Sequence, residues 1–435
     1  MQPFIHIIGL GVTETEQLST DALDALAQAA LVVGSKRQLE IVKPKLVKQT
    51  TSVLPKLNQL KSLIEHSNAQ HVVILASGDP LYYGIGRWFS KQFTPEQLRY
   101  YPAVSSIQAA CHSIGLSLQA TKVISLHGRP VLTLRRHLAQ QRYLVILTDQ
   151  HSSPQALAAL CHDAGFSQSR LWVCEQLGYE NQKVREFSVD ELVNDSTELQ
   201  FDPLHVTIIK VTGETKYLPS FPGIPDHHFI TDSDAGRGLI TKREVRLAIL
   251  SLLQPAPDDI GWDIGAGCGG VAVEWALWNQ LGNVHAIEHH PQRFECLEQN
   301  QQRFGVVDNL KTVQGRAPEV LSHLPAANKI FIGGSDGELP VLLGSLWRTL
   351  PDGGVIVASA VMETSRTQLI HFAEKIERDV SDSESYNSDH GQTLPQGEVE
   401  TLQVAISRGG KLAGQLLYRP SLPVTLFKFI KPHKN

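Results

Sequence analysis

Short apolar runs alternate with amphipathic stretches through the first half of the chain. The runs long enough to form strands are residues 4–8, 72–76, 123–126, 144–148, 171–175 and 206–211. Residues 20–31 place their apolar side chains on one helical face, behind a Ser or Thr N-cap. Strands that alternate with helices predict an α/β domain whose helices cover a parallel or mixed sheet.

This pattern breaks at residues 213–235, where Pro219, Pro222 and Pro225 stand among polar residues. Helical periodicity then resumes after Thr241-Lys242-Arg243-Glu244, which predicts a capping box. We therefore expect a first domain at 1–212, a linker at 213–235 and a second domain at 236–435. Residues 381–396 are polar, and we expect a surface loop there.

The second domain is also predicted to be α/β. Its expected strands are residues 260–264, 284–288, 310–313, 330–332, 355–359, 402–407, 415–418 and 424–429. We expect the last three to form an antiparallel edge. A sheet of seven strands that ends in antiparallel ones resembles the Rossmann-like fold of class I S-adenosylmethionine-dependent methyltransferases.

Composition limits the classes of function. The 435 residues are 42% hydrophobic and 19% charged, which is typical of a soluble globular protein of two domains. A net charge of −5 argues against a nucleic-acid binder but leaves room for an anionic small molecule. The five cysteines contain no C-x-x-C pair, which favours a reducing cytoplasm. No apolar run approaches the ~20 residues that a membrane helix needs.

A glycine-rich turn at residues 265–270 follows a predicted strand, and Glu288 ends the next strand. Glycines let the backbone approach a nucleotide, and the acid can accept hydrogen bonds from ribose hydroxyls. Asp263 stands where an acid can help to hold the amino-acid part of S-adenosylmethionine. The turn at 314–319 is placed to cover an adenine edge. The same glycine spacing also fits a dinucleotide, so an NAD-binding oxidoreductase remains an alternative.

Residues 236–430 resemble the precorrin methyltransferases that methylate carbon 15 of the corrin ring and decarboxylate its ring-C acetate. The matching segments are 238–246, 262–267, 315–319, 331–337 and 407–409. The resemblance implies donor contacts from Thr241, Gly265, Ala266, Gly267, Cys268, Gly269, Glu288 and Ala317. Gly334 and Ser335 lie in the most family-specific turn and are catalytic candidates. Leu422 replaces the family's usual Asn, a small departure.

The first domain resembles the tetrapyrrole methylase family, and its precorrin branch that acts on carbon 5. The segments that carry the resemblance are 77–84, 102–106 and 125–129, together with the first glycine turn. That family has a two-lobed fold with the methyl donor in the cleft. The donor contacts carried over are Gly9, Gly11, Gly78, Asp79, Ser105 and Ser106. Val12 and Ala103 depart from the family's pattern.

Several other polar residues have a structural interpretation beside a functional one. His127 is a catalytic candidate, although a hydrogen-bonded structural histidine explains it equally well. His227-His228 and His289-His290 lack further ligands at metal spacing, so no metal site is expected. Arg135 and Arg136 are expected on a solvated helix face. Cys268 has no activating base at a suitable spacing, and we interpret it as a small packing residue.

The two domains in this order resemble the fused methyltransferases of cobalamin (vitamin B12) biosynthesis. The resemblance implies methylation of a precorrin-6 intermediate at carbons 5 and 15, with decarboxylation to give precorrin-8. It also implies two S-adenosylmethionine sites per chain, no nucleic-acid or membrane partner, and a homo-oligomer, such as a tetramer formed through the C-terminal domain. The alternatives are a methyltransferase of another substrate with an idle N-terminal lobe, the NAD-dependent enzyme, and a non-catalytic tetrapyrrole carrier.

Overall fold

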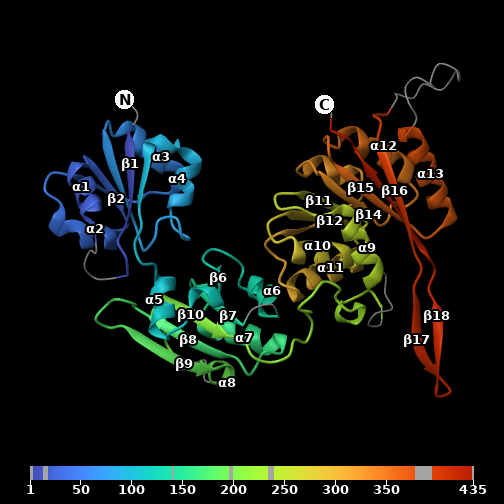
Figure 1. Ribbon diagram of the computed structural model, residues 1–435, viewed down its shortest axis with the longest axis horizontal. Helices are drawn as coiled ribbons and strands as arrows, with labels where there is room; N and C mark the ends of the chain where they lie inside the picture. Colours follow the sequence, from blue (N-terminus) through green and yellow to red (C-terminus); the bar gives the residue numbers. More distant parts are fainter. Residues whose placement is uncertain are drawn as a thin grey trace. The chain divides into compact units, whose positions relative to one another are not determined.

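The computed structural model describes residues 3–12, 18–139, 142–194, 199–233, 240–377 and 394–433. It divides into two compact units. The first contains Met1–Val131 and Gln141–Glu214, and the second contains Leu132–Gln140 and Thr215–Asn435 (Figure 1). Most of the predicted surface loop at 381–396 lies outside the described residues, as do Arg237 and Gly238.

The first lobe of unit 1 is a parallel sheet in the order β3-β2-β4-β1-β5. Its strands are β1 (Phe4–Gly9), β2 (Leu31–Gly34), β3 (Thr50–Val53), β4 (His71–Ala76) and β5 (Leu98–Tyr101). Its helices are α1 (Thr20–Gln28), α2 (Lys36–Val42), α3 (Leu57–His66) and α4 (Gly86–Gln92). The predicted helix at 20–31 is too long. Helix α1 ends at Gln28, the backbone of Ala29 is extended, and β2 begins at Leu31.

The second lobe is a mixed sheet in the order β6-β7-β10-β8-β9, in which only β6 and β7 run parallel. Its strands are β6 (Lys122–Ser125), β7 (Tyr143–Leu147), β8 (Arg170–Glu175), β9 (Lys183–Ser188) and β10 (His205–Lys210). Helices α5 (Ser106–Ser113), α7 (Pro154–Ala164) and α8 (Val189–Asn194) accompany it. The two lobes confirm the predicted tetrapyrrole methylase fold.

Unit 2 holds a seven-stranded sheet in the order β13-β12-β11-β14-β15-β19-β16. Its strands are β11 (Ile260–Ile264), β12 (Asn283–Glu288), β13 (Leu310–Gln314), β14 (Lys329–Ile332), β15 (Val355–Ala360), β16 (Glu398–Val404) and β19 (Val424–Ile430). Strand β19 is antiparallel to both of its neighbours, β15 and β16, and the other neighbouring pairs are parallel. This layout, together with the family match, confirms the class I methyltransferase prediction.

Helices cover both faces of this sheet. Side chains of α9 (Arg243–Leu253), α10 (Gly270–Trp278) and α11 (Pro291–Arg303) share one core cluster with the sheet. Side chains of α12 (Leu339–Thr349) and α13 (Glu363–Glu377) share the other. Residues Gly270 to Leu277 of α10 are all buried, so this helix is enclosed on every side. Two buried faces explain why the central strands β11, β14 and β15 are mostly apolar.

Two strands of unit 2 stand apart from the sheet. β17 (Ser407–Leu412) and β18 (Gln415–Pro420) pair only with each other, and every residue in them is exposed. The prediction that residues 415–418 belong to the antiparallel sheet edge is therefore wrong. Figure 1 shows this hairpin extending away from the body of its unit.

The segment expected to be a linker is largely packed into unit 2. Leu218, Ile224 and Phe229 are buried in the core cluster of α9 and α10. The predicted capping box is wrong, because the N-cap of α9 is Lys242, whose own side chain makes no cap hydrogen bond. Instead, Asp226 of the packed segment accepts a hydrogen bond from the Arg243 amide.

A short piece from the first half of the sequence also belongs to unit 2. It comprises the end of a 3₁₀ turn (Val131–Leu134) and helix α6 (Arg135–Leu138). Arg136 is only 3% exposed, so the expectation of a solvated helix face is wrong for this residue.

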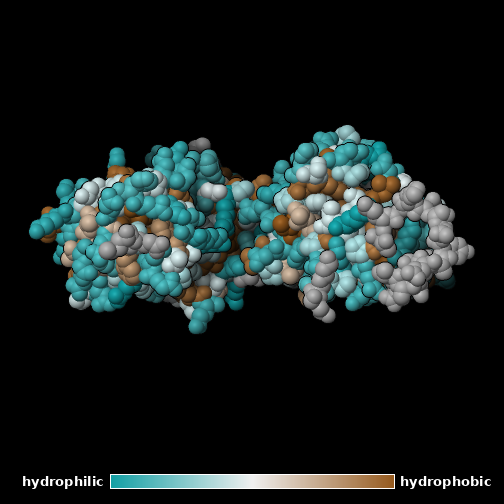
Figure 2. Space-filling model, turned by 90° about the horizontal axis from the view of Figure 1, so that it is seen from above, coloured by the Kyte–Doolittle hydropathy of each residue, from teal (hydrophilic) through white to brown (hydrophobic). Residues whose placement is uncertain are grey.

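The face drawn in Figure 2 is mostly polar, with apolar side chains scattered among the polar ones. Within the described ranges, no helix combines the length and apolarity needed to cross a bilayer.

Candidate functional sites

Unit 1 contains a cleft of about 1630 Å³ that is lined from both lobes. The carboxyl ends of β1, β4, β6 and β7 contribute to the lining, and so do the two serines at the N-terminus of α5. Ligands of open α/β sheets bind at the carboxyl ends of the strands, where loops present free backbone groups. The cleft therefore lies where the fold predicts a ligand.

The first lobe supplies most of the residues carried over by resemblance. Gly11, Gly78, Ser105 and Ser106 line the cleft. Gly9 does not line it, but a side chain there would clash with the Gly78 carbonyl, so the two loops need this glycine to meet. Ser105 caps α5 by accepting from the Gln108 amide at 3.2 Å.

Asp79 has a local structural role in the same loop. Its Oδ1 accepts hydrogen bonds from the amides of Leu81 (2.8 Å) and Tyr82 (3.1 Å). Such an Asx turn fixes the loop that follows β4. Asp79 is absent from the cleft lining, whereas Tyr82 and Tyr83 are part of it.

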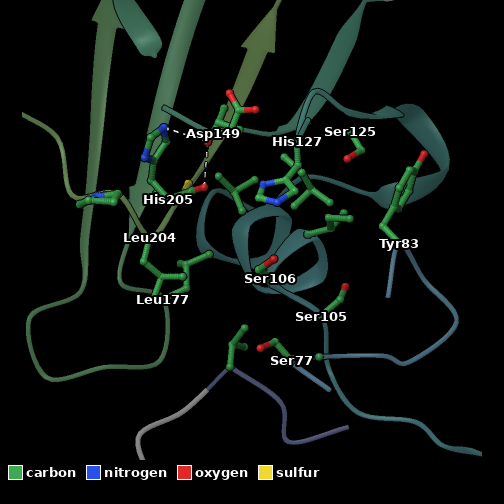
Figure 3. A pocket seen from close by; sticks show the side chains of 18 of the residues that line it. Ser77, Tyr83, Ser105, Ser106, Ser125, His127, Asp149, Leu177, Leu204 and His205 are labelled. Atoms are coloured by element: carbon green, nitrogen blue, oxygen red, sulfur yellow. Dashed lines mark hydrogen bonds between the residues drawn. The ribbon is translucent and has the colours of Figure 1, made fainter. Parts of the chain in front are cut away.

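The second lobe faces these loops with His127, Gly128 and Asp149. In Figure 3, Asp149 and His127 lie on the side of the cavity opposite Ser77. Asp149 is itself engaged: hydrogen bonds from the amides of Gly128 and His151 lower its pKa to about 2. Its role is to shape the His127–Gly128 loop by holding the Gly128 amide at 2.8 Å.

The charge of the lining is predominantly positive. Arg37, Arg87 and Arg129 line the cleft, and Asp149 is the only carboxylate among the described lining residues. Arg37 donates to Tyr179 Oη at 2.8 Å and to Ser77 Oγ at 3.1 Å, which joins residues from the two lobes. Sequence reasoning missed Arg37 because it follows β2, a strand of only 4 residues that was not predicted.

In unit 2 the glycine turn follows β11. Gly265, Gly267 and Gly269 adopt positive φ angles of 72°, 58° and 86°. Residues with a Cβ atom rarely adopt these angles, so the turn requires glycine at these positions. The Gly265 and Ala266 amides both donate to the Ile287 carbonyl at 3.0 Å, which fixes the turn against β12.

Glu288 lies at the end of β12 and is 4% exposed. Its Oε2 accepts from the Gly267 amide and its Oε1 from the His290 amide, both at 2.8 Å. A carboxylate oxygen has two lone-pair sites, so each oxygen retains one acceptor position. Glu288 thus fits two roles at once, holding the glycine turn and accepting from a ribose.

The turn after β14 closes the same edge. The amides of Gly333 and Gly334 donate to the Ile264 carbonyl at 2.9 and 3.4 Å, and the Ser335 carbonyl accepts from the Glu338 amide at 2.8 Å. Next to Ser335, the Asp336 carboxylate lies 3.4 Å from the His289 ring and 3.6 Å from the Arg316 guanidinium. The loops after β11, β12, β13 and β14 therefore meet at one edge.

The other predicted site residues of unit 2 are more enclosed. Asp263 is 1% exposed, and burial raises its pKa to about 7. Burial likewise raises the pKa of Cys268 to about 12, which suits a packing residue. Thr241 is half-buried, with its carbonyl accepting from Arg246 at 2.6 Å, and Ala317 packs at the edge of the apolar core. No cluster of three or more His, Cys, Asp or Glu in the described ranges could hold a metal.

Two domain families match the chain. Residues 5–193 match the Tetrapyrrole (Corrin/Porphyrin) Methylases, and residues 233–431 match the Precorrin methyltransferase domain. Over the whole length, a Precorrin-6Y C(5,15)-methyltransferase (decarboxylating) from Sinorhizobium sp is 32% identical across 433 residues, 99% of this chain and 97% of that protein. The chain belongs to the decarboxylating precorrin-6Y C(5,15)-methyltransferase family.

Other relatives agree with this membership. An enzyme of the same name from Mycobacterium tuberculosis (strain CDC 1551 / Oshkosh) is 31% identical over 98% of this chain and 100% of its own length. A shorter relative from Methanothermobacter thermautotrophicus, a probable cobalt-precorrin-6B C(15)-methyltransferase (decarboxylating), is 33% identical over 40% of this chain and 88% of its own length. Both matched domains of this methyltransferase family are S-adenosylmethionine-dependent.

Proposed function

We propose that each unit performs one methylation of a precorrin-6 intermediate with its own bound S-adenosylmethionine. The cleft of unit 1 acts at carbon 5, and the carboxyl edge of the unit 2 sheet acts at carbon 15 and in the decarboxylation. Two separate strand-end sites, one in each unit, carry this proposal. The M. thermautotrophicus relative supports it, since a C(15)-methyltransferase there matches only 40% of this chain.

The donor supplies an activated methyl group, whose bond to sulfur breaks as the bond to the macrocycle carbon forms. The protein then needs to position the partners and exclude water, and it needs neither a metal nor a nucleophilic triad. In unit 1, Arg37, Arg87 and Arg129 give the cleft the charge to hold a polycarboxylate such as a precorrin. His127 is placed to contact that substrate from the second lobe.

In unit 2, Ser335 is the proposed positioning group for the acetate arm that loses CO2. When the bond between the methylene carbon and the carboxylate breaks, its electron pair passes into the macrocycle, and a proton from solvent then completes the methyl group. Ser335→Leu is expected to abolish carbon-15 methylation and CO2 release while carbon-5 methylation continues. Ser345→Leu, on the exposed face of α12, is the matched control. A Ser335→Leu enzyme with unchanged product would refute this role.

The number of donor sites is tested by calorimetric titration of the full chain with S-adenosylhomocysteine. Two sites are expected, of which Gly265→Arg removes one and leaves the other. A single site that Gly265→Arg abolishes would mean that the first unit binds no donor. Complete absence of binding, with NADH bound instead, would favour the dinucleotide enzyme over a methyltransferase.

We further propose that copies of the chain associate through unit 2. The hairpin β17–β18 exposes Leu416 (67%) and Tyr418 (63%) on one face and Leu412 (55%) on the other, and these apolar side chains have no partner within the described chain. Sedimentation analysis is expected to show an oligomer that Leu416→Glu converts to monomers.

Five unpaired, buried cysteines support a reducing compartment such as the cytoplasm.

A further inference from the structure

A single arginine from the first half of the sequence is embedded in unit 2. The chain leaves unit 1 after Val131, and Leu132–Gln140 belongs to unit 2. Within this segment Arg136 is 3% exposed. Its Nη1 donates to Asn309 Oδ1 at 2.8 Å, and its Nη2 donates to the carbonyls of Ala276 at 2.6 Å and Leu277 at 3.3 Å.

Those two carbonyls belong to the last turn of α10. The last four carbonyls of a helix lack partners within it and carry about half a negative charge. Burial lowers the pKa of Arg136 to about 10, so the guanidinium remains protonated at neutral pH. A buried cation at this position satisfies the carbonyls and complements the helix dipole. Asn309 completes the arrangement, because its Nδ2 donates to Ala276 and Asn279 carbonyls, each at 2.9 Å.

The opposite end of α10 is the glycine turn. The helix begins at Gly270, directly after Gly269, and its residues Gly270 to Leu277 are all buried. Any displacement of its C-terminus therefore moves the turn, since a packed helix shifts as a rigid rod. Asn300 of α11 anchors the turn separately by donating to the Cys268 carbonyl at 2.8 Å.

A backbone contact fixes the segment in addition to Arg136. A Cβ atom at Gly305, just after α11, would lie 2.7 Å from the Leu132 carbonyl oxygen and 2.8 Å from the Arg136 amide nitrogen. Its φ of +67° also favours glycine. The segment thus fits against unit 2 at a position where only a residue without a side chain can lie.

We propose that Arg136 is a positioning residue of the carbon-15 centre, which it serves by fixing the end of α10 opposite the donor-binding turn. The proposal rests on the proposed function of that turn. It makes the second active centre depend on a side chain that precedes most of the second lobe of unit 1 in the sequence. Arg129, which lines the unit 1 cleft, precedes this segment by only a few residues. The same stretch of chain therefore contributes residues to both units.

Arg136→Ala tests the proposal in the full chain, with exposed Arg142→Ala as the control for loss of one positive charge. Calorimetry with S-adenosylhomocysteine is expected to show at least a tenfold weaker affinity at the site that Gly265→Arg abolishes, and an unchanged affinity at the other. Carbon-15 methylation falls by a similar factor, while carbon-5 methylation persists. Millimolar guanidinium, but not urea, is expected to restore part of the affinity by filling the vacated space.

A purely structural role would lower the unfolding temperature of unit 2 but leave that affinity and the guanidinium response unchanged, which would overturn the proposal. Hydrogen exchange of the wild-type chain provides a test that needs no Arg136 variant. Adding S-adenosylhomocysteine is expected to slow exchange in residues 132–139 and α10 together, and Gly265→Arg should remove this response. An unaltered exchange rate in 132–139 contradicts the proposal. Lack of any second binding site contradicts the proposed function itself.

Discussion

Gly265 and Gly334 contact each other through their backbones at the carboxyl ends of β11 and β14. A Cβ atom added to Gly265 would lie 2.7 Å from both the amide nitrogen and the carbonyl oxygen of Gly334. The resemblance assigns donor binding to the Gly265 turn and a catalytic role to the Gly334 turn. The two turns nevertheless form one surface. The proposed donor turn and the proposed decarboxylation turn cannot move independently.

Replacing Gly265 with Ala is expected to disable the carbon-15 centre. The new methyl group would push the Gly334 turn away, and the φ of +72° would add strain. We expect at least a hundredfold loss of carbon-15 methylation with carbon-5 methylation retained, measured by product analysis. Gly337→Ala is the matched control, because it has a φ of +87° and nothing within 4 Å of the added atom. Equal losses in both variants would assign the effect to strain alone.

Glu288→Gln should weaken donor binding in unit 2. The replacement leaves one acceptor oxygen, and its amide group would face the amide of either Gly267 or His290. We expect at least a tenfold rise in the dissociation constant for S-adenosylhomocysteine at this site, because the turn loses a charge-assisted hydrogen bond. Glu298→Gln on the exposed side of α11 serves as the control. An unaltered constant would exclude Glu288 as a support of the turn.

Much of the fold follows from the apolar runs, because buried parallel strands are nearly continuous in hydrophobicity. The runs at β1, β4 and β11 were therefore predictable. The strand β2 was missed because its first residue, Leu31, was included in the predicted helix, and β3 and β5 were missed because polar residues interrupt these short strands. The hairpin β17–β18 was assigned to the sheet because a strand's sequence does not specify its pairing partner.

The site residues divide in the same way. Glycines and Glu288 could be placed from spacing, because their positions relative to a strand end determine what they can contact. Arg136 could not, since its role depends on the carbonyls of Ala276 and Leu277, far away in sequence. From sequence alone, a charged residue on a short helix is expected to be exposed to solvent, because its tertiary partners are not known. Asp226 was missed for the same reason.

Arg246→Met is expected to destabilise unit 2 strongly. Arg246 is fully buried, and its guanidinium lies 2.7 Å from Asp226 and 3.6 Å from Glu274, both of which are also buried. Removal of the cation leaves Glu274 without its cationic partner and Asp226 with only the half-exposed Arg408, which costs about 3–5 kcal/mol. Arg408 also contacts Asp226, at 3.3 Å, but is half exposed, so Arg408→Ala should cost only about 0–1 kcal/mol. Urea unfolding of the two variants should show this difference, and similar values would contradict it.

The stability of unit 1 should fall as the pH drops from about 6.5 to about 4, because of His6. Burial, with repulsion from His71 and Arg99, lowers the pKa of His6 to about 4 from 6.5. The folded state therefore binds fewer protons than the unfolded state within this window. The stability contributed by neutral His6 is fully present above pH 6.5 and is lost as the pH falls through about 4, by on the order of 3 kcal/mol.

Neutral His6 also makes specific contacts, with Nδ1 2.9 Å from Tyr101 Oη and Nε2 3.1 Å from His71 Nδ1. Urea unfolding of the wild-type chain, monitored by hydrogen exchange in β1 and β4, should show this pH dependence of the stability of unit 1. His6→Gln should be less stable at pH 7 but flatter between pH 7 and 5, because the titrating group is gone. His66→Gln, at an exposed position of α3, should retain the wild-type slope. A slope that His6→Gln leaves unchanged would assign the acid sensitivity to other groups.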